Sequence, residues 1–193
     1  MDKSDRWWLF SALATFIVGM SFWGLWYVNS QKEQSPSTPT EEVVGEHSSS
    51  THELLHQQLP EFKMTNTDGK EVSSSEFYDK PMVIVDWASW CPHCQEHLPI
   101  IQKLYEEYGD RIHFVMINLT DNAQEPKSQV DAYVKENKFT FPYYYDLGQQ
   151  AADSLKVEYL PTTYFVDGQQ IIKDIRVSEM NEKELRQAIE SLF

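Results

Sequence analysis

The middle of the chain reads MVIVDWASWCPHC from Met82 to Cys94. Its apolar start, Met82 to Val85, follows Pro81 and is typical of a buried central strand. The two cysteines come soon after this strand and are separated by two residues. Pro92 stands between them, at a position where a helix start tolerates a missing N–H. This stretch therefore predicts a buried strand, a turn and then a helix that begins at the cysteines.

The spacing of Cys91 and Cys94 predicts thiol chemistry. We expect the Cys91 sulfur at the helix start, where unpaired N–H groups and the helix dipole stabilise a thiolate. Cys94 is then close enough to resolve a mixed disulfide. His93 can donate a hydrogen bond toward sulfur or carry positive charge nearby, which favours the dithiol form. Cys91 and Cys94 are thus the expected catalytic pair, and Pro92 and His93 are expected to tune it.

Other uses of these residues remain open. A Cys-x-x-Cys pair is also half of a zinc site, but the chain has no other cysteine, so His93 and His97 would have to complete the ligands. We expect no metal. A structural disulfide is a weak alternative, because a bridge between such close residues constrains little of the unfolded chain. His93 could instead be an exposed spacer, and His97 is expected to be structural or exposed.

Strands and helices alternate on both sides of the cysteine motif. The Asp68-Gly69 pair predicts a hairpin turn, and the apolar spacing predicts the other elements. The expected order is a hairpin over 59–64 and 71–72, the helix 92–108 with Pro99 inside it, the strand 113–119, the helix 128–137, the strand 141–145, the helix 148–156, the strands 162–166 and 171–177, and the helix 182–192. This order predicts an α/β domain over 53–193, with a mixed central sheet and flanking helices.

The N-terminal part of the chain predicts a membrane anchor and a tether. No side chain from Trp7 to Val28 is charged, and as a helix this segment would extend about 33 Å, close to the thickness of the bilayer hydrocarbon. Basic residues within 1–6 place the N-terminus in the cytoplasm by the positive-inside rule. Residues 29–52 are polar and are expected to form a flexible extracytoplasmic linker. A cleaved signal peptide is the alternative, and both interpretations export the remaining chain.

The charge of the chain restricts its partners. The formal net charge is -14, which repels nucleic acid and anionic lipid surfaces. We therefore expect protein or small-molecule partners and no nucleic acid, with bilayer contact only through the N-terminal helix.

Taken together, these motifs resemble membrane-anchored thioredoxin-like proteins of the TlpA/ResA type. The resemblance extends from about Leu59 to Leu192 and is carried by the strand at Met82, the cysteine motif, Pro99 and the segment Tyr159-Leu160-Pro161-Thr162-Thr163. It implies a thioredoxin-like fold with a cis peptide bond before Pro161. It also implies a substrate groove formed by Trp90, Leu160 and Pro161, and an extra helix within 120–141.

Three positions depart from the family pattern. Val85 falls where thioredoxins carry a buried acid, and Asp86 should face the other side of the strand, so we expect Asp86 to be a polar residue at the strand edge. Ser178 stands near the usual position of a groove glycine. The dipeptide Pro92-His93 resembles that of oxidising DsbA-type proteins rather than the reductants of the TlpA/ResA group, so the direction of reaction stays open.

The resemblance implies an extracytoplasmic thiol-disulfide oxidoreductase that acts on secreted or membrane client proteins. It implies no bound cofactor and an integral membrane partner that resets the cysteine pair. A copper metallochaperone of the Sco type is the main alternative, although it uses a distant histidine and no histidine follows His113. A peroxiredoxin is a further alternative, and it would need a Thr-x-x-Cys site.

Overall fold

The structure is a computed structural model, and it describes residues 52–121 and 123–193. The predicted anchor at 7–28 lies outside the described residues, as does the predicted linker up to residue 51. Within the described ranges, no helix combines the length and the apolar character needed to cross a membrane.

A seven-stranded sheet forms the middle layer of the domain, with strand order β2-β1-β5-β4-β3-β6-β7. Its central strand β3 pairs in parallel with β4 and antiparallel with β6, so the sheet is mixed, as predicted. The strands are β1 (Lys63–Thr65), β2 (Glu71–Ser73), β3 (Met82–Trp87), β4 (His113–Asn118), β5 (Tyr143–Tyr145), β6 (Thr162–Val166) and β7 (Ile172–Val177).

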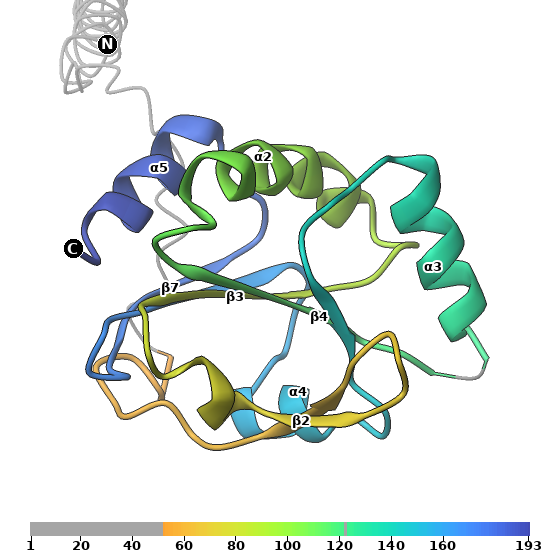
Figure 1. Cartoon of the computed structure of the whole chain (residues 1–193), viewed down its shortest axis with the longest axis horizontal. Helices are drawn as coiled ribbons and strands as arrows, with labels where there is room; N and C mark the ends of the chain where they lie inside the picture. The colour runs from red at the N-terminus through yellow and green to blue at the C-terminus, as the bar shows by residue number, and fades with distance from the viewer. Residues whose placement is uncertain (1–51, 122) are drawn as a thin grey trace, which may run out of the picture. The chain divides into compact units, whose positions relative to one another are not determined.

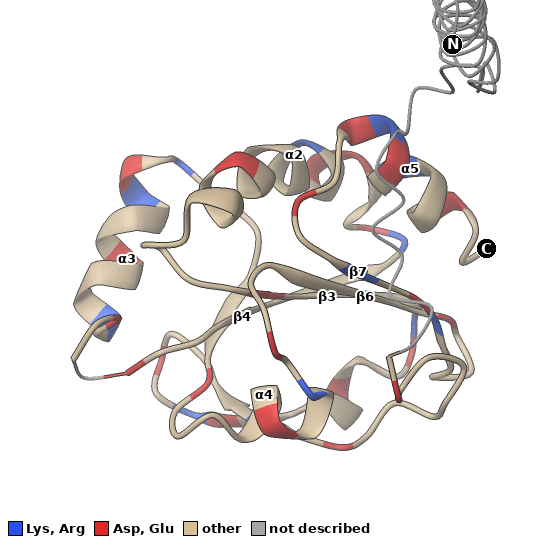
Figure 2. Cartoon of the chain, turned by 180° about the vertical axis from the view of Figure 1, so that it is seen from behind, with Lys and Arg blue, Asp and Glu red and all other residues tan. Residues whose placement is uncertain are grey.

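Helices cover both faces of this sheet. Three of them, α2, α3 and α5, lie on one face, and α4 lies on the other (Figure 1). Their bounds are α2 (Pro92–Tyr108), α3 (Lys127–Glu136), α4 (Gln150–Leu155) and α5 (Glu182–Glu190), and a short 3-10 helix, η2 (Ser74–Phe77), follows β2. Acidic residues are spread over the helices of both faces (Figure 2).

The alternation of side chains along β3 gives the domain two cores. Val83 and Val85 belong to the core under α2 and α5, whereas Met82 and Ile84 belong to the core that includes residues of α4. Every residue of β3 is buried, because helices cover both faces of the strand. Burial of both faces explains why β3 begins with the uninterrupted apolar run from Met82 to Val85.

Within the described residues, the predicted strands and helices of the α/β domain are present, and their bounds differ from the predictions by a few residues. The opening hairpin is confirmed, with Met64 opposite Val72 and Gly69 at a φ of 80° in the turn. The strand predicted to end at Val85 continues to Trp87, because β3 has pairing partners in β4 up to its last residue. The helix over Pro92–Tyr108 has the predicted bounds.

Candidate active site around Cys91 and Cys94

Cys91 is the N-cap of α2. Its backbone is extended, with φ -80° and ψ 118°, and its sulfur accepts a hydrogen bond from the backbone N–H of Cys94 at 3.4 Å. Pro92 occupies the first helical turn, where no intrahelical N–H bond is lost. The Cys91 sulfur thus lies at the helix start, as the sequence predicts, and contacts the N–H of Cys94.

The two thiols lie in different surroundings. Both cysteines are unpaired thiols, and Cys94 is fully buried, whereas Cys91 keeps 5% of its surface exposed. Burial raises the pKa of Cys94, and the hydrogen bond with Cys91 raises it further. Cys94 is therefore held in its protonated form behind Cys91, and a reagent from solvent meets Cys91 first.

The predicted groove residues gather beside Cys91. The Leu160–Pro161 peptide bond is cis, as the resemblance implies. The carbonyl oxygen of Leu160 lies 3.6 Å from the Cys91 sulfur and accepts a hydrogen bond from it. Trp90 and Tyr159, which precede these two positions in sequence, expose 42% and 66% of their surfaces. The site therefore presents a thiol next to a backbone carbonyl, with exposed aromatic rings on both chain segments.

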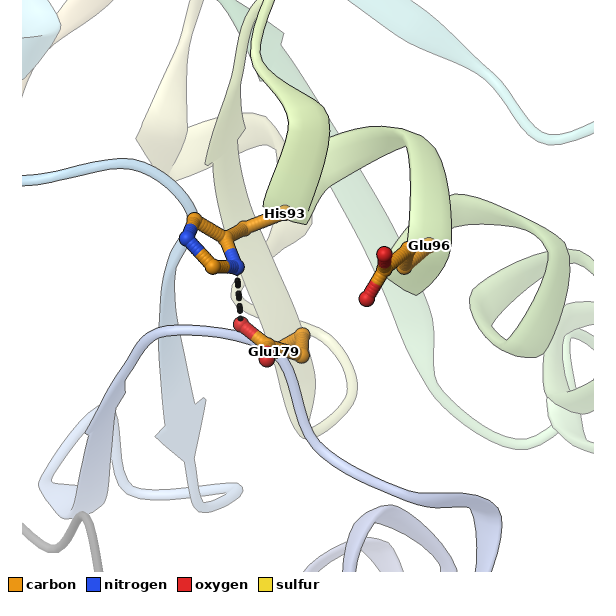
Figure 3. A group of neighbouring side chains, drawn as sticks. All are labelled: His93, Glu96 and Glu179. Atoms are coloured by element: carbon orange, nitrogen blue, oxygen red, sulfur yellow. Dashed lines mark ion pairs between the residues drawn. The ribbon is translucent and has the colours of Figure 1, made fainter.

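His93 has a partner that sequence reasoning missed. Its Nδ1 atom lies 2.9 Å from a carboxylate oxygen of Glu179, in the loop between β7 and α5 (Figure 3). The Ser178 hydroxyl donates to the same carboxylate, and this hydrogen bond, together with a backbone N–H and the contact with His93, lowers the pKa of Glu179. His93 is thus paired with a carboxylate rather than being a free spacer, although 60% of its side chain is exposed.

His97 is buried against the same loop. Its Nδ1 accepts a hydrogen bond from the Met180 N–H at 3.1 Å, and its Nε2 lies 3.4 Å from the Thr163 hydroxyl. Burial lowers the pKa of His97 to about 4, so the ring is neutral at neutral pH. The expectation of a structural histidine is confirmed, and the expectation of an exposed one is wrong. A zinc site at the cysteines would need this ring, whose two nitrogens face Met180 and Thr163.

Ser178, near the usual position of the groove glycine, takes a backbone conformation that favours glycine. Its φ of 86° lies in the left-handed region that favours glycine. Its N–H donates to the carbonyl of Pro161 at 2.8 Å. The departure at this position therefore leaves the backbone in a glycine-like shape and adds a hydroxyl next to Glu179.

A second missed residue, Glu125, holds the turn in front of Cys91. Its fully buried carboxylate accepts hydrogen bonds from the Ser89 N–H at 2.6 Å and the Ser89 hydroxyl at 2.8 Å. Asn118 and Gln129 donate to the same carboxylate at 2.9 and 3.0 Å. Nothing in the sequence distinguishes Glu125 from other acidic residues, because its donors come from three separate segments.

Asp86 corrects the expectation of a polar residue at the strand edge. It faces away from Val85, as predicted, but it is fully buried in the middle of the sheet. Neither carboxyl oxygen has a hydrogen-bond partner among the described residues. Burial and the nearby Asp146 raise the pKa of Asp86 well above its usual value. The expectation was wrong because β3 continues past Asp86 and has neighbours on both sides.

One group of described side chains has metal-ligand chemistry. His93, Glu96 and Glu179 place one ligand atom each within 4.8 Å of the others (Figure 3). All three side chains keep solvent access, and neither cysteine belongs to the group.

Comparisons with known proteins agree with this fold. The AhpC/TSA family matches residues 55–175. The thioredoxin-like protein YneN of Bacillus subtilis (strain 168) is 31% identical over 183 residues, which cover 95% of this chain and 96% of that protein. The thiol-disulfide oxidoreductase ResA of Geobacillus thermodenitrificans (strain NG80-2) is 29% identical, over 69% of this chain and 75% of that protein.

A solved structure shows the same architecture. A DsbF homologue from Corynebacterium diphtheriae is 27% identical and superposes with a TM-score of 0.63, over 70% of this chain and 87% of that one. The fold, the family match and the named relatives all point to one class of enzyme. The chain belongs to the AhpC/TSA family and is a thiol-disulfide oxidoreductase of the TlpA/ResA type.

Proposed function

We propose that the protein exchanges disulfides with secreted or membrane client proteins through Cys91, and that Cys94 resolves the mixed disulfide. The observation that carries this proposal is the position of the Cys91 sulfur at the start of α2, where it accepts the Cys94 N–H. This position favours a thiolate at Cys91. The burial of Cys94 keeps the second thiol protonated until the first has reacted.

The exchange uses only the two sulfurs and a client. When the pair is oxidised, a client thiolate attacks the Cys91 sulfur, the bond between Cys91 and Cys94 breaks, and Cys94 leaves and takes up a proton. A second client thiolate then attacks the client sulfur and releases Cys91 as a thiolate. The client has lost two electrons and the cysteine pair has gained them. The reverse sequence reduces a client disulfide, so no bound cofactor is required in either direction.

The local chemistry favours the oxidising direction. The helix start favours the Cys91 thiolate, and His93 in its charged form does the same. Any interaction that favours the reduced pair raises its reduction potential. An integral membrane partner would then remove the electrons and reset the disulfide.

We also propose that the domain works outside the cytoplasm as part of a single-pass membrane protein. The support comes from the sequence, because Trp7 to Val28 carries no charge and basic residues precede it. Disulfide chemistry is also favoured outside the cytoplasm, where glutathione and thioredoxin do not keep thiols reduced.

Trapping of mixed disulfides tests the assigned roles. Cys94→Ser should accumulate mixed disulfides with clients through Cys91, because the resolving thiol is missing. Cys91→Ser should accumulate none, because Cys94 is buried. Non-reducing gels of cells that express each variant give the answer. Equal trapping by both variants, or by neither, would contradict the roles given to the two cysteines.

A further inference from the structure

The loop from Ser178 to Asn181 joins β7 to α5 and contacts three parts of the active site with successive residues. The Ser178 N–H donates to the Pro161 carbonyl at 2.8 Å. The Glu179 carboxylate pairs with His93 at 2.9 Å, and the Met180 N–H donates to His97 at 3.1 Å. Hydrogen bonds from two backbone N–H groups thus hold the loop on both sides of Glu179, which fixes the position from which its side chain reaches His93.

Glu179 is the residue through which this loop reaches the cysteine motif. Figure 3 shows the His93 ring turned from the start of α2 toward Glu179, with Glu96 one turn further along the helix. The Ser178 hydroxyl donates to the carboxylate oxygen that His93 contacts. Among the described residues, no hydrogen bond joins the His93 ring to either sulfur. The Cys91 sulfur has its hydrogen bonds with the Leu160 carbonyl and the Cys94 N–H.

The charge of this pair sets the sign of its effect on the thiolate. With Glu179 ionised, His93 and Glu179 together carry a charge of -1 or zero, depending on whether the ring is protonated. With glutamine at position 179, the two residues carry zero or +1. The charge near Cys91 is therefore less positive with glutamate than with glutamine. The carboxylate also occupies Nδ1 of the imidazole, so this nitrogen is not free to donate a hydrogen bond to the sulfur.

We propose that Glu179 is a positioning residue that lowers the reduction potential of the Cys91–Cys94 pair by binding and neutralising His93. This inference deepens the proposed function and rests on it. The helix start and Pro92-His93 raise the reduction potential of the pair. Glu179 reduces the part of this increase that comes from His93. The reduction potential therefore stays lower than the Pro92-His93 motif alone would give, because Glu179 in the loop after β7 binds His93.

The test is the redox equilibrium of the full chain, purified in detergent, with glutathione buffers at one fixed pH. The fraction of dithiol is read by alkylation and gel shift or mass. Glu179→Gln should shift the equilibrium constant toward the dithiol by roughly two- to fivefold, the range of a partly exposed ion pair. Fivefold corresponds to about 20 mV for this two-electron couple. Glutamine keeps the length and a hydrogen-bonding oxygen, so the loop should stay folded.

Two comparisons separate a role through His93 from a plain change of charge. Glu96→Gln removes the same charge from the same neighbourhood without breaking an ion pair, and it should give a smaller shift. The effect of Glu179→Gln should also shrink in a chain that carries His93→Asn, because the ring that Glu179 binds is then absent. Equal shifts from Glu96→Gln, or equal shifts with and without His93, would overturn the positioning role.

The wild-type measurement distinguishes a failure of the role of Glu179 from a failure of the proposed disulfide exchange. If the wild-type pair does not exchange with glutathione at all, the proposed function fails. If the wild-type protein and Glu96→Gln both equilibrate and Glu179→Gln keeps the wild-type constant, only the role of Glu179 fails.

Discussion

At the residue scale, two buried ionisable groups give the domain opposite responses to pH. His97 of α2 packs against the loop after β7, and burial lowers its pKa to about 4. Asp86 lies on the other face of the sheet, and burial raises its pKa. Burial disfavours the charged form of each group in the folded state. Each group therefore lowers the free energy of unfolding at pH values where the same side chain is charged in the unfolded chain.

For His97, we expect the free energy of unfolding to fall as the pH drops below about 6.5. The unfolded chain binds a proton at this residue in the range from about 6.5 to 4, and the folded chain does not. Between pH 7.5 and 5 the loss from this group is about 2 kcal/mol. Urea unfolding at both pH values measures it. His97→Asn keeps an acceptor for the Met180 N–H and should remove most of this slope; an unchanged slope would contradict the assignment.

For Asp86, the expected sign is reversed. Its folded pKa lies above the unfolded value, so its contribution to stability is greatest below the unfolded pKa and is lost as the pH rises through the folded pKa. Asp86→Asn removes the ionisation at similar shape. We expect this variant to gain stability relative to wild type as the pH is raised from 5 to 8, because the unfolded wild-type chain ionises at this residue more readily than the folded chain. A difference between the two proteins that does not vary with pH would show that ionisation of Asp86 costs nothing.

At the element scale, the segment before α3 is hydrogen-bonded to the turn between β3 and Cys91. Glu125 accepts two hydrogen bonds from Ser89, and Gln95 of α2 donates to the Ser89 carbonyl at 2.8 Å. The extra helix that the resemblance implies within 120–141 is α3, and the buried carboxylate of Glu125 connects the start of this helix to the turn before Cys91. We expect these hydrogen bonds to restrain the turn between β3 and α2.

Removal of this carboxylate should affect both stability and exchange. Glu125→Ala removes the buried acceptor of the Ser89 and Asn118 donors, and we expect a loss of about 2–4 kcal/mol in the free energy of unfolding. Thiol exchange by Cys91 should slow in the protein that remains folded, because the preceding turn loses its anchor. Glu136→Ala, at the exposed end of α3, is the matched control and should change neither quantity. Equal behaviour of the two variants would remove Glu125 from the site.

At the scale of the whole molecule, we propose that the N-terminal segment places the chemistry outside the cytoplasm. We expect the full chain to remain with membranes after a carbonate wash, because an uncharged segment of this length is favourable in the bilayer. External protease should digest the C-terminal domain in intact cells. A chain that lacks residues 1–28 serves as the control and should be released by the wash. Recovery of a natural soluble form that begins near Gln31 would favour the cleaved signal peptide instead.

The sequence by itself determined the elements, the family and the position of the cysteine pair. These features depend on short-range patterns: the apolar run of β3, the start of α2 at Cys91 and Pro92, and the turn at Gly69. Each pattern acts within a few residues, so it predicts local structure without knowledge of distant neighbours. The cis bond before Pro161 was also predicted, through the family resemblance.

Only the tertiary structure decided which polar groups serve the site. The partner of His97 lies 83 positions away in sequence, and the partner of Glu125 lies 36 positions away. The pairing of His93 with Glu179 and the burial of Asp86 depend in the same way on which segments the sheet and helices bring together. The sequence pattern of a charged residue is the same whether it ends in solvent or in a core. Its environment, and therefore its chemistry, is set by neighbours that the folded chain alone supplies.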